Sequence, residues 1–144
     1  MIGLKPLASV QDSAELMARI PPELLALAEA REPWTSYVAF GVDGIAVGTC
    51  AFKSAPSAKK EVEIAYLTFP EQERRGYGAA MAQSLVAIAA GTGKVERVIA
   101  QTLREENASV RICRRLNFMF CMSVRTVVSS IHTYCETRRK NSIP

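Results

Sequence analysis

Apolar and polar residues form short runs along the chain, and the period of these runs differs from one to the next. Residues 61–69, EVEIAYLTF, show a period of two that places Val62, Ile64 and Tyr66 on one face of a predicted strand. Residues 77–90, YGAAMAQSLVAIAA, are apolar around most of a predicted helix. We therefore expect a half-buried strand followed by a buried helix that stops at the glycines of 91–93.

The rest of the chain divides into short elements that alternate between the two types. Ser9 is a candidate helix cap, Pro22 suits a first helical turn, and Asp43-Gly44 between two β-rich runs predicts a hairpin. The further predicted elements are a strand in 2–7, helices in 9–20 and 21–30, strands in 34–42, 45–52 and 95–103, a helix in 107–118, and a closing hairpin in 118–135. This order predicts an α/β sandwich with a mixed sheet.

The composition is that of one soluble globular domain. The 144 residues are 49% apolar and 22% charged, and no run approaches the roughly 18 apolar residues that a membrane span needs. The start lacks a charged segment followed by a long apolar one, so we expect a cytoplasmic protein that does not enter a membrane. The formal charge is +4, but the basic run at 138–140 is typical of a solvated tail and has no interleaved aromatic residues, so we do not expect nucleic-acid binding.

The metal-binding and nucleophilic residue types show no organised spacing. The four cysteines lack any Cys-x-x-Cys pair, so we expect small buried side chains rather than a zinc site or a disulfide framework; they are Cys50, Cys113, Cys121 and Cys135. His132 is the one histidine, and a structural or surface role is expected for it. Trp34 suits the core, or a groove for a substrate. No metal is expected.

The turn between the predicted strand and helix, ERRGYGAA at 73–80, is the candidate anion site. A glycine-containing turn that leads directly into a helix leaves backbone N–H groups unpaired at the positive end of the helix dipole. Arg74 and Arg75 would strengthen a preference for a diphosphate, whereas an ordinary tight turn with two solvated arginines is the alternative. Met81 occupies the small-residue position of a dinucleotide-binding fingerprint, and GTGK at 91–94 lacks the other residues of a phosphate-binding loop, so both of those motifs are excluded.

The segments on both sides of this turn resemble the GNAT acetyltransferase superfamily. The resemblance covers Glu61 to Phe118 and rests on EIAYLTFPEQERRGYGAA followed, after a helix and a strand, by NASVRICRRLNF. It is closest to the branch that includes the ribosomal-protein N-terminal acetyltransferases. Glu73 stands where that branch prefers Gln or Arg, and Arg74 where many members have a glycine. The resemblance implies a single GNAT-like domain over 1–144, with a mixed, mostly antiparallel central sheet, a V-shaped splay and flanking helices.

The resemblance also implies acetyl-CoA as co-substrate, held across the splay between the strands of 61–69 and 95–103. Its pantetheine arm would pair with backbone near the end of the first strand, and its pyrophosphate would rest on the turn. The implied cofactor-binding residues are Leu67, Thr68, Phe69, Arg74, Arg75, Gly76, Tyr77, Gly78, Ala79, Ala80 and Asn107. The activity implied is N-acetyl transfer to a primary amine, either a protein N-terminus or a small molecule, with a homodimer as one possible assembly.

Direct attack of an amine on a thioester requires a base for the ammonium proton and an acid for the departing thiolate. Glu63 is the candidate base, although a solvated strand carboxylate is the alternative reading. Cys113 stands where family members often carry a Tyr acid, so Ser109 becomes the candidate acid, or else a serine that bonds its own helix start. The competing hypothesis is a catalytically weak or inactive GNAT-like module that binds an acyl-CoA or a partner.

Overall fold

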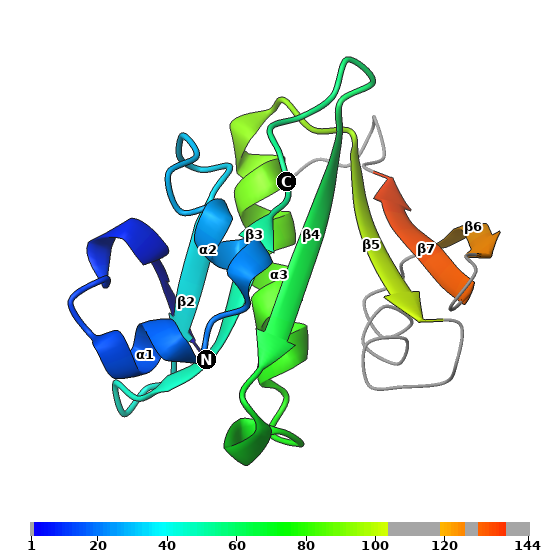
Figure 1. The fold of residues 1–144 in the computed structure, drawn as a ribbon. Coiled ribbons are helices and arrows are strands. Elements are labelled where there is room, and N and C mark those ends of the chain that lie inside the picture. The colour runs from blue at the N-terminus through cyan, green and yellow to red at the C-terminus, as the bar shows by residue number, and fades with distance from the viewer. Residues whose placement is uncertain (1, 104–118, 126–129, 138–144) are drawn as a thin grey trace.

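A seven-stranded sheet organises the computed structural model, which describes residues 2–103, 119–125 and 130–137 (Figure 1). In spatial order the strands are β1 (Gly3–Pro6), β2 (Ser36–Phe40), β3 (Ala46–Phe52), β4 (Glu61–Thr68), β5 (Arg97–Leu103), β7 (Ser130–Thr137) and β6 (Met119–Arg125). Neighbours are antiparallel except β4 and β5, which run parallel. The predicted mixed, mostly antiparallel sheet and its closing hairpin are therefore confirmed.

Short helices connect the first two strands. They are the 3₁₀ turn η1 (Leu7–Ser9), α1 (Ala14–Ala18) and α2 (Pro22–Ala26). Pro22 opens α2, as predicted. The predicted cap of the first helix was wrong, because Ser13 rather than Ser9 accepts the bond from the Leu16 amide at 3.2 Å. Ser9 instead donates to the Pro6 carbonyl at 2.7 Å, which closes the 3₁₀ turn and leaves Ser13 at the helix start.

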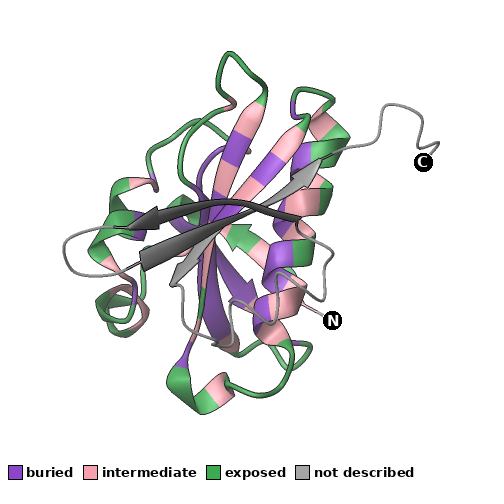
Figure 2. Cartoon of the chain, turned by 90° about the vertical axis from the view of Figure 1, so that its right-hand side faces the viewer, coloured by how far each residue is buried: buried purple, intermediate pink, exposed green. Residues whose placement is uncertain are grey.

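The long helix α3 (Tyr77–Thr92) begins after Gly76 and ends at Gly93, where a φ of +70° suits glycine. Its buried residues are Gly78, Met81, Ala82, Leu85 and Ala89, and in Figure 2 the buried positions gather on the side of this helix that faces the sheet. Gln83 and Ala87 are exposed. The helix that was predicted to be buried is therefore buried on its sheet-facing side, while the other side includes exposed alanines, whose small side chains cost little in water.

Each face of the sheet carries its own core. On one face α3 packs on β3 and β4 through Phe52, Ile64 and Leu85, and full burial of side chains of this kind contributes about 1.5–3 kcal/mol each. On the other face η1, α1 and α2 pack on β2 and β3 around Val38 and Ala51. Along β4 the predicted alternation of buried and less buried side chains holds around Val62 and Ile64. Both of these residues pack on the α3 side, and Glu63 between them faces away from α3.

The parallel strands β4 and β5 pair over only part of their length. Their register runs from Glu61 opposite Arg97 to Ile64 opposite Ala100 and stops there. Both strands continue, β4 to Thr68 and β5 to Leu103, and they diverge in Figure 1. This divergence is the V-shaped splay that the family resemblance implied.

Candidate active site

The turn at the open end of the splay reverses the chain through two left-handed residues. After β4 come η2 (Pro70–Gln72), then Arg74 with φ +65° and Gly76 with φ +82°. Arg75 donates to the Gln72 side chain at 3.3 Å, while Arg74 is exposed. Arg74 thus has the backbone conformation that a glycine adopts most easily, at the position where the family pattern often has one.

The first turn of α3 leaves its amides available to a ligand. Gly76, the N-cap residue, provides no side-chain bond, and no acidic residue lies in the first turn. The Ala80 amide is bonded to the Gly76 carbonyl at 3.1 Å, so the amides of Tyr77, Gly78 and Ala79 precede the first helical bond. Amides at the positive end of a 16-residue helix, beside two exposed arginines, favour an anion such as a pyrophosphate.

The last residues of β4 are held closely from the β3 side. A Cβ on Gly48 of β3 would lie 2.3 Å from the Leu67 carbonyl oxygen, so only glycine allows this approach. The Phe69 amide donates to Val47 at 2.9 Å, and its carbonyl accepts from Gln72 at 2.8 Å. Both polar backbone groups of Phe69 are thus engaged and its ring is buried, whereas Leu67 remains 43% exposed. Phe69 is thus part of the packing of β4 on β3, and Leu67, Thr68 and Phe69 stay predictions as pantetheine contacts.

Glu63 lies on the face opposite α3, one position before β4 leaves β5. Its Oε2 is 2.5 Å from Nζ of Lys53. The two groups form an ion pair that lacks hydrogen-bond geometry, and Oε2 is buried with no hydrogen-bond partner among the described residues. The carboxylate is 24% exposed. Glu63 therefore lies at the point where the splay opens, on the face away from α3, and its role as a base stays a prediction.

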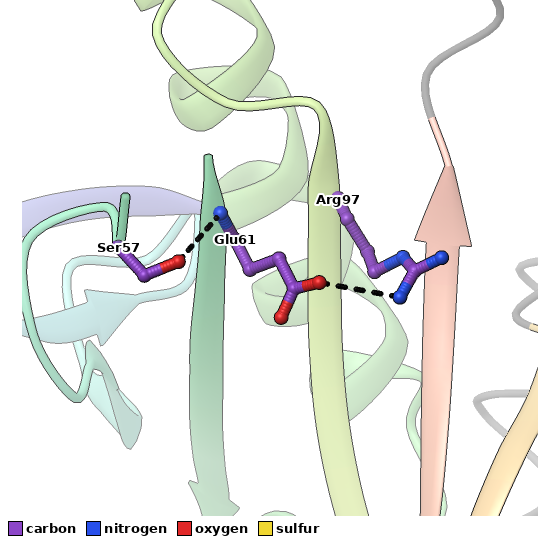
Figure 3. Close-up of polar contacts among 3 residues, drawn as sticks. All are labelled: Ser57, Glu61 and Arg97. Carbon is purple, nitrogen blue, oxygen red and sulfur yellow. Dashed lines mark hydrogen bonds and ion pairs between the residues drawn. The ribbon is translucent and has the colours of Figure 1, made fainter. Parts of the chain in front are cut away.

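The closed end of the splay is fastened by a second ion pair (Figure 3). Nη1 of Arg97 on β5 lies 3.2 Å from Oε1 of Glu61 on β4, and the Glu61 amide donates to Oγ of Ser57. The Lys60 carbonyl accepts from the amides of Glu96 and Arg97 at 2.8 and 3.2 Å. Backbone and side chains together fix the point from which the two strands diverge.

Arg19, which follows α1, connects the helices on the other face to the turn. Its guanidinium carbon lies 4.0 Å from the Phe69 ring centroid, and it forms an ion pair with Glu71. The hydrogen bond from Arg19 lowers the pKa of the Glu71 carboxyl. Sequence reasoning missed this contact, because Arg19 is separated from Phe69 by 50 positions and nothing in the local pattern pairs them.

The remaining candidates differ in what the structure says of them. Cys50 is fully buried, as expected, and burial raises the pKa of its thiol, which keeps it protonated. Trp34 packs edge-to-face on Phe52 in the core. His132 lies in β7 opposite Thr102. Two predicted site residues, Asn107 and Ser109, lie outside the described residues, as does Cys113.

Two kinds of feature are absent from the described part of the chain. No helix in it is both long and apolar enough to cross a membrane. Within the same ranges, no three His, Cys, Asp or Glu side chains are grouped so that they could hold a metal ion.

Solved structures share this fold. The structure of yncA from Salmonella typhimurium with its cofactor acetyl-CoA has a TM-score of 0.69 and 19% identity, over 83% of this chain and 75% of that one. RimL, a ribosomal L7/L12 alpha-N-protein acetyltransferase in complex with coenzyme A, has a TM-score of 0.65 and 18% identity, over 71% of this chain and 60% of that one. A protein assigned as a phosphinothricin N-acetyltransferase has a TM-score of 0.72 and 13% identity, over 97% and 100%. At these identities the likeness shows the fold alone.

Sequence comparison supplies the family. No curated protein matches the chain significantly. The family model described as "Acetyltransferase (GNAT) domain" matches residues 4–119, which include the splay, the turn and α3. The chain therefore belongs to the GNAT acetyltransferase domain family.

Proposed function

We propose that this protein is an acetyl-CoA-dependent N-acetyltransferase that transfers an acetyl group to a primary amine by direct attack. The observation that carries the proposal is the uncapped start of α3, directly after a strand that parts from its parallel neighbour at Ile64. The motif resemblance further suggests a relationship to the branch of ribosomal-protein N-terminal acetyltransferases.

The described residues offer contacts for two parts of acetyl-CoA, its pyrophosphate and its pantetheine arm. The pyrophosphate would be bound by the amides of Tyr77, Gly78 and Ala79, between Gly76 and Ala80, with Arg74 and Arg75 beside it. The pantetheine arm would lie along β4 at Leu67 and Thr68, beyond the last pair with β5. Asn107 is proposed as a further contact. Acetyl-CoA supplies the acetyl group as an activated thioester.

Glu63 is proposed as the general base. Its carboxylate would accept the proton of the acceptor ammonium, directly or through a water molecule, so that the free amine can form the new C–N bond. The C–S bond breaks in the same transfer, and Ser109 is proposed to give a proton to the sulfur. Lys53 must share Glu63 with the incoming ammonium, since the two side chains are already paired.

Replacement of the base tests the catalytic part of the proposal. Loss of a positioned general base typically lowers rates by about 10²–10⁴-fold, so we expect Glu63→Gln to lower kcat within that range at neutral pH. The affinity for acetyl-CoA should change little, because the turn that binds it is untouched. The measurement is thiol release from acetyl-CoA with a panel of amines, together with acetyl-CoA binding by calorimetry.

Glu61→Gln is the matched control, because Glu61 is a carboxylate on the same face of the same strand that pairs with Arg97 instead. We expect it to retain kcat within a few-fold of the parent. Equal rates for Glu63→Gln and the parent would remove Glu63 from the mechanism.

The second candidate is a GNAT-like module that binds acetyl-CoA and transfers little or nothing. The ion pair between Glu63 and Lys53 favours it, since a carboxylate already neutralised by a cation is a poorer base. Calorimetric binding of acetyl-CoA without transfer to any amine would support this candidate and contradict the enzyme.

A further inference from the structure

Four charged side chains lie around the proposed base on the side of the sheet away from α3. They come from β4, from β5 and from the residue after β3, and they form two ion pairs, Lys53 with Glu63 and Arg97 with Glu61. We call Lys53, Glu61, Glu63 and Arg97 the charged quartet. The two cations are the more exposed members, at 49% for Lys53 and 43% for Arg97, against 24% and 27% for the carboxylates.

The backbone fixes Lys53 directly beside Glu63. Lys53 follows the last residue of β3, and its amide donates to the Glu63 carbonyl at 2.9 Å. Their side chains therefore project from facing positions on the side of the sheet away from α3. An amine that reaches Glu63 along this face must approach Lys53 as well, and Arg97 lies one strand further on.

This arrangement discriminates among amines by charge. A simple cationic amine would be attracted by Glu63 but repelled by Lys53 and Arg97, whose charges are at least as accessible. It would also displace Lys53 from the Glu63 carboxylate and leave the Lys53 cation without that ion pair. An acceptor that brings its own anion avoids both penalties.

We propose that the acceptor is a small amino acid, with its ammonium at Glu63 and its carboxylate at Lys53, and that Lys53 determines this specificity. The inference rests on the proposed acetyltransferase function. One internal ion pair is exchanged for two pairs with the substrate, so every charge in the bound complex has a partner. After the ammonium proton passes to Glu63, the carboxylate still holds the substrate at Lys53.

The spacing of the two head groups selects a small acceptor over a protein N-terminus. Nζ of Lys53 and Oε2 of Glu63 lie side by side, 2.5 Å apart, so an acceptor that pairs with both must carry its amine and its carboxylate close together. A peptide N-terminus has an uncharged amide where the free amino acid has its carboxylate. It would therefore occupy Glu63 and leave Lys53 unpaired.

The test compares free amino acids with their amides as acceptors, at saturating acetyl-CoA. Each pair shares a side chain and differs in the carboxylate. Rates are compared at equal concentrations of the unprotonated amine, because amidation lowers the pKa of the amino group. We expect the parent protein to prefer the free acid by at least about 10-fold in kcat/KM, a difference typical of one charged contact. Short peptides with the same first residue form the third arm, and we expect them to resemble the amides.

Lys53→Gln should reduce the preference for the acid over the amide to about 3-fold or less, mainly through a higher KM for the acid. Lys59→Gln is the matched control, since it removes the same charge from the exposed loop before β4. It should keep the parent's preference. A parent protein that prefers amides or peptides, or a Lys53→Gln variant that keeps the full preference for acids, would overturn the inference.

Failure of the proposed function gives a different result. If no amine is acetylated although acetyl-CoA binds, binding of the free acid and the amide to the acetyl-CoA complex is compared by calorimetry. Tighter binding of the acid, lost in Lys53→Gln, supports the inference, and equal or absent binding of both overturns it. Absence of acetyl-CoA binding contradicts the proposed function itself, and the inference falls with it.

Discussion

Two consecutive reversals in the turn before α3 are made by residues of different kinds. Gly76 has φ +82° at no steric cost, whereas Arg74 has φ +65° with a side chain attached. A residue with a Cβ in this conformation costs about 1–2 kcal/mol relative to the right-handed one. Arg74 therefore places a cation beside the proposed pyrophosphate site at the expense of backbone strain.

Arg74→Gly should stabilise the fold and weaken acetyl-CoA binding at once. The relief of strain exceeds the greater entropy that glycine loses on folding, so we expect a net gain of about 0.5–1 kcal/mol, or about 2–4 °C in Tm. The loss of one charge near the pyrophosphate should raise the Kd for acetyl-CoA several-fold. Thermal unfolding and calorimetry measure the two effects.

Arg74→Ala separates them, because it removes the same charge and keeps a Cβ. It should lose affinity as Arg74→Gly does without the gain in Tm. An equal Tm for the two variants would mean that the left-handed backbone at Arg74 costs no more than the extra entropy that glycine loses on folding, and would contradict the expected gain.

Among the elements, α1 and the segment between β4 and α3 are joined by one side chain. Arg19 stacks on Phe69 and forms an ion pair with Glu71. The order of the elements along the chain does not by itself bring these residues together. The hydrogen bond with Arg19 holds the pKa of Glu71 below its ordinary value. Because the folded-state pKa is depressed, the stability from this pair is present above the ordinary pKa of a glutamate, about 4.3, and is lost as the pH falls through the folded-state value.

Glu71→Gln should accordingly lower the Tm at pH 7, and the difference from the parent should shrink as the pH falls below the ordinary glutamate pKa of about 4.3. The effect should be small and should fall with added salt, since the carboxylate is exposed. Glu73→Gln, an exposed carboxylate two positions away, is the control and should show no such gap. A Tm difference for Glu71→Gln that stays constant between pH 7 and pH 3 would contradict the assignment.

Sequence-based prediction of the site succeeded where one strand or one turn decided the outcome. The period of two along β4 placed Glu63 on the face opposite Val62 and Ile64, and the glycine-containing turn indicated where the long helix begins. Prediction failed where distant segments meet. Nothing local to Glu63 indicates Lys53, since their pairing depends on the register of β3 against β4, and nothing local to Phe69 indicates Arg19.

For the molecule as a whole, the central claim is that α3 and the splay together bind acetyl-CoA. Two features of the fold support it. The parallel strands β4 and β5 part after Ile64 and Ala100, and the N-cap residue of α3, Gly76, has no side chain to accept a hydrogen bond from the first amides of the helix. Ala79, the third residue of α3, offers a sharp test. A glutamate at this helical position stabilises the helix start by about 0.3–1 kcal/mol, yet it places a negative charge where the pyrophosphate would bind.

The most direct measurement is a calorimetric titration of the parent, Ala79→Glu and Ala79→Gln with acetyl-CoA, with NAD and ATP as control ligands. Glutamine has the size of glutamate without the charge, so the difference between the two variants isolates electrostatics at the helix start. We predict micromolar binding of acetyl-CoA to the parent, and at least about 10-fold weaker binding to the Glu variant than to the Gln variant, with Tm values no lower than the parent's. Equal affinities for the two variants, or no binding to the parent, would contradict the account.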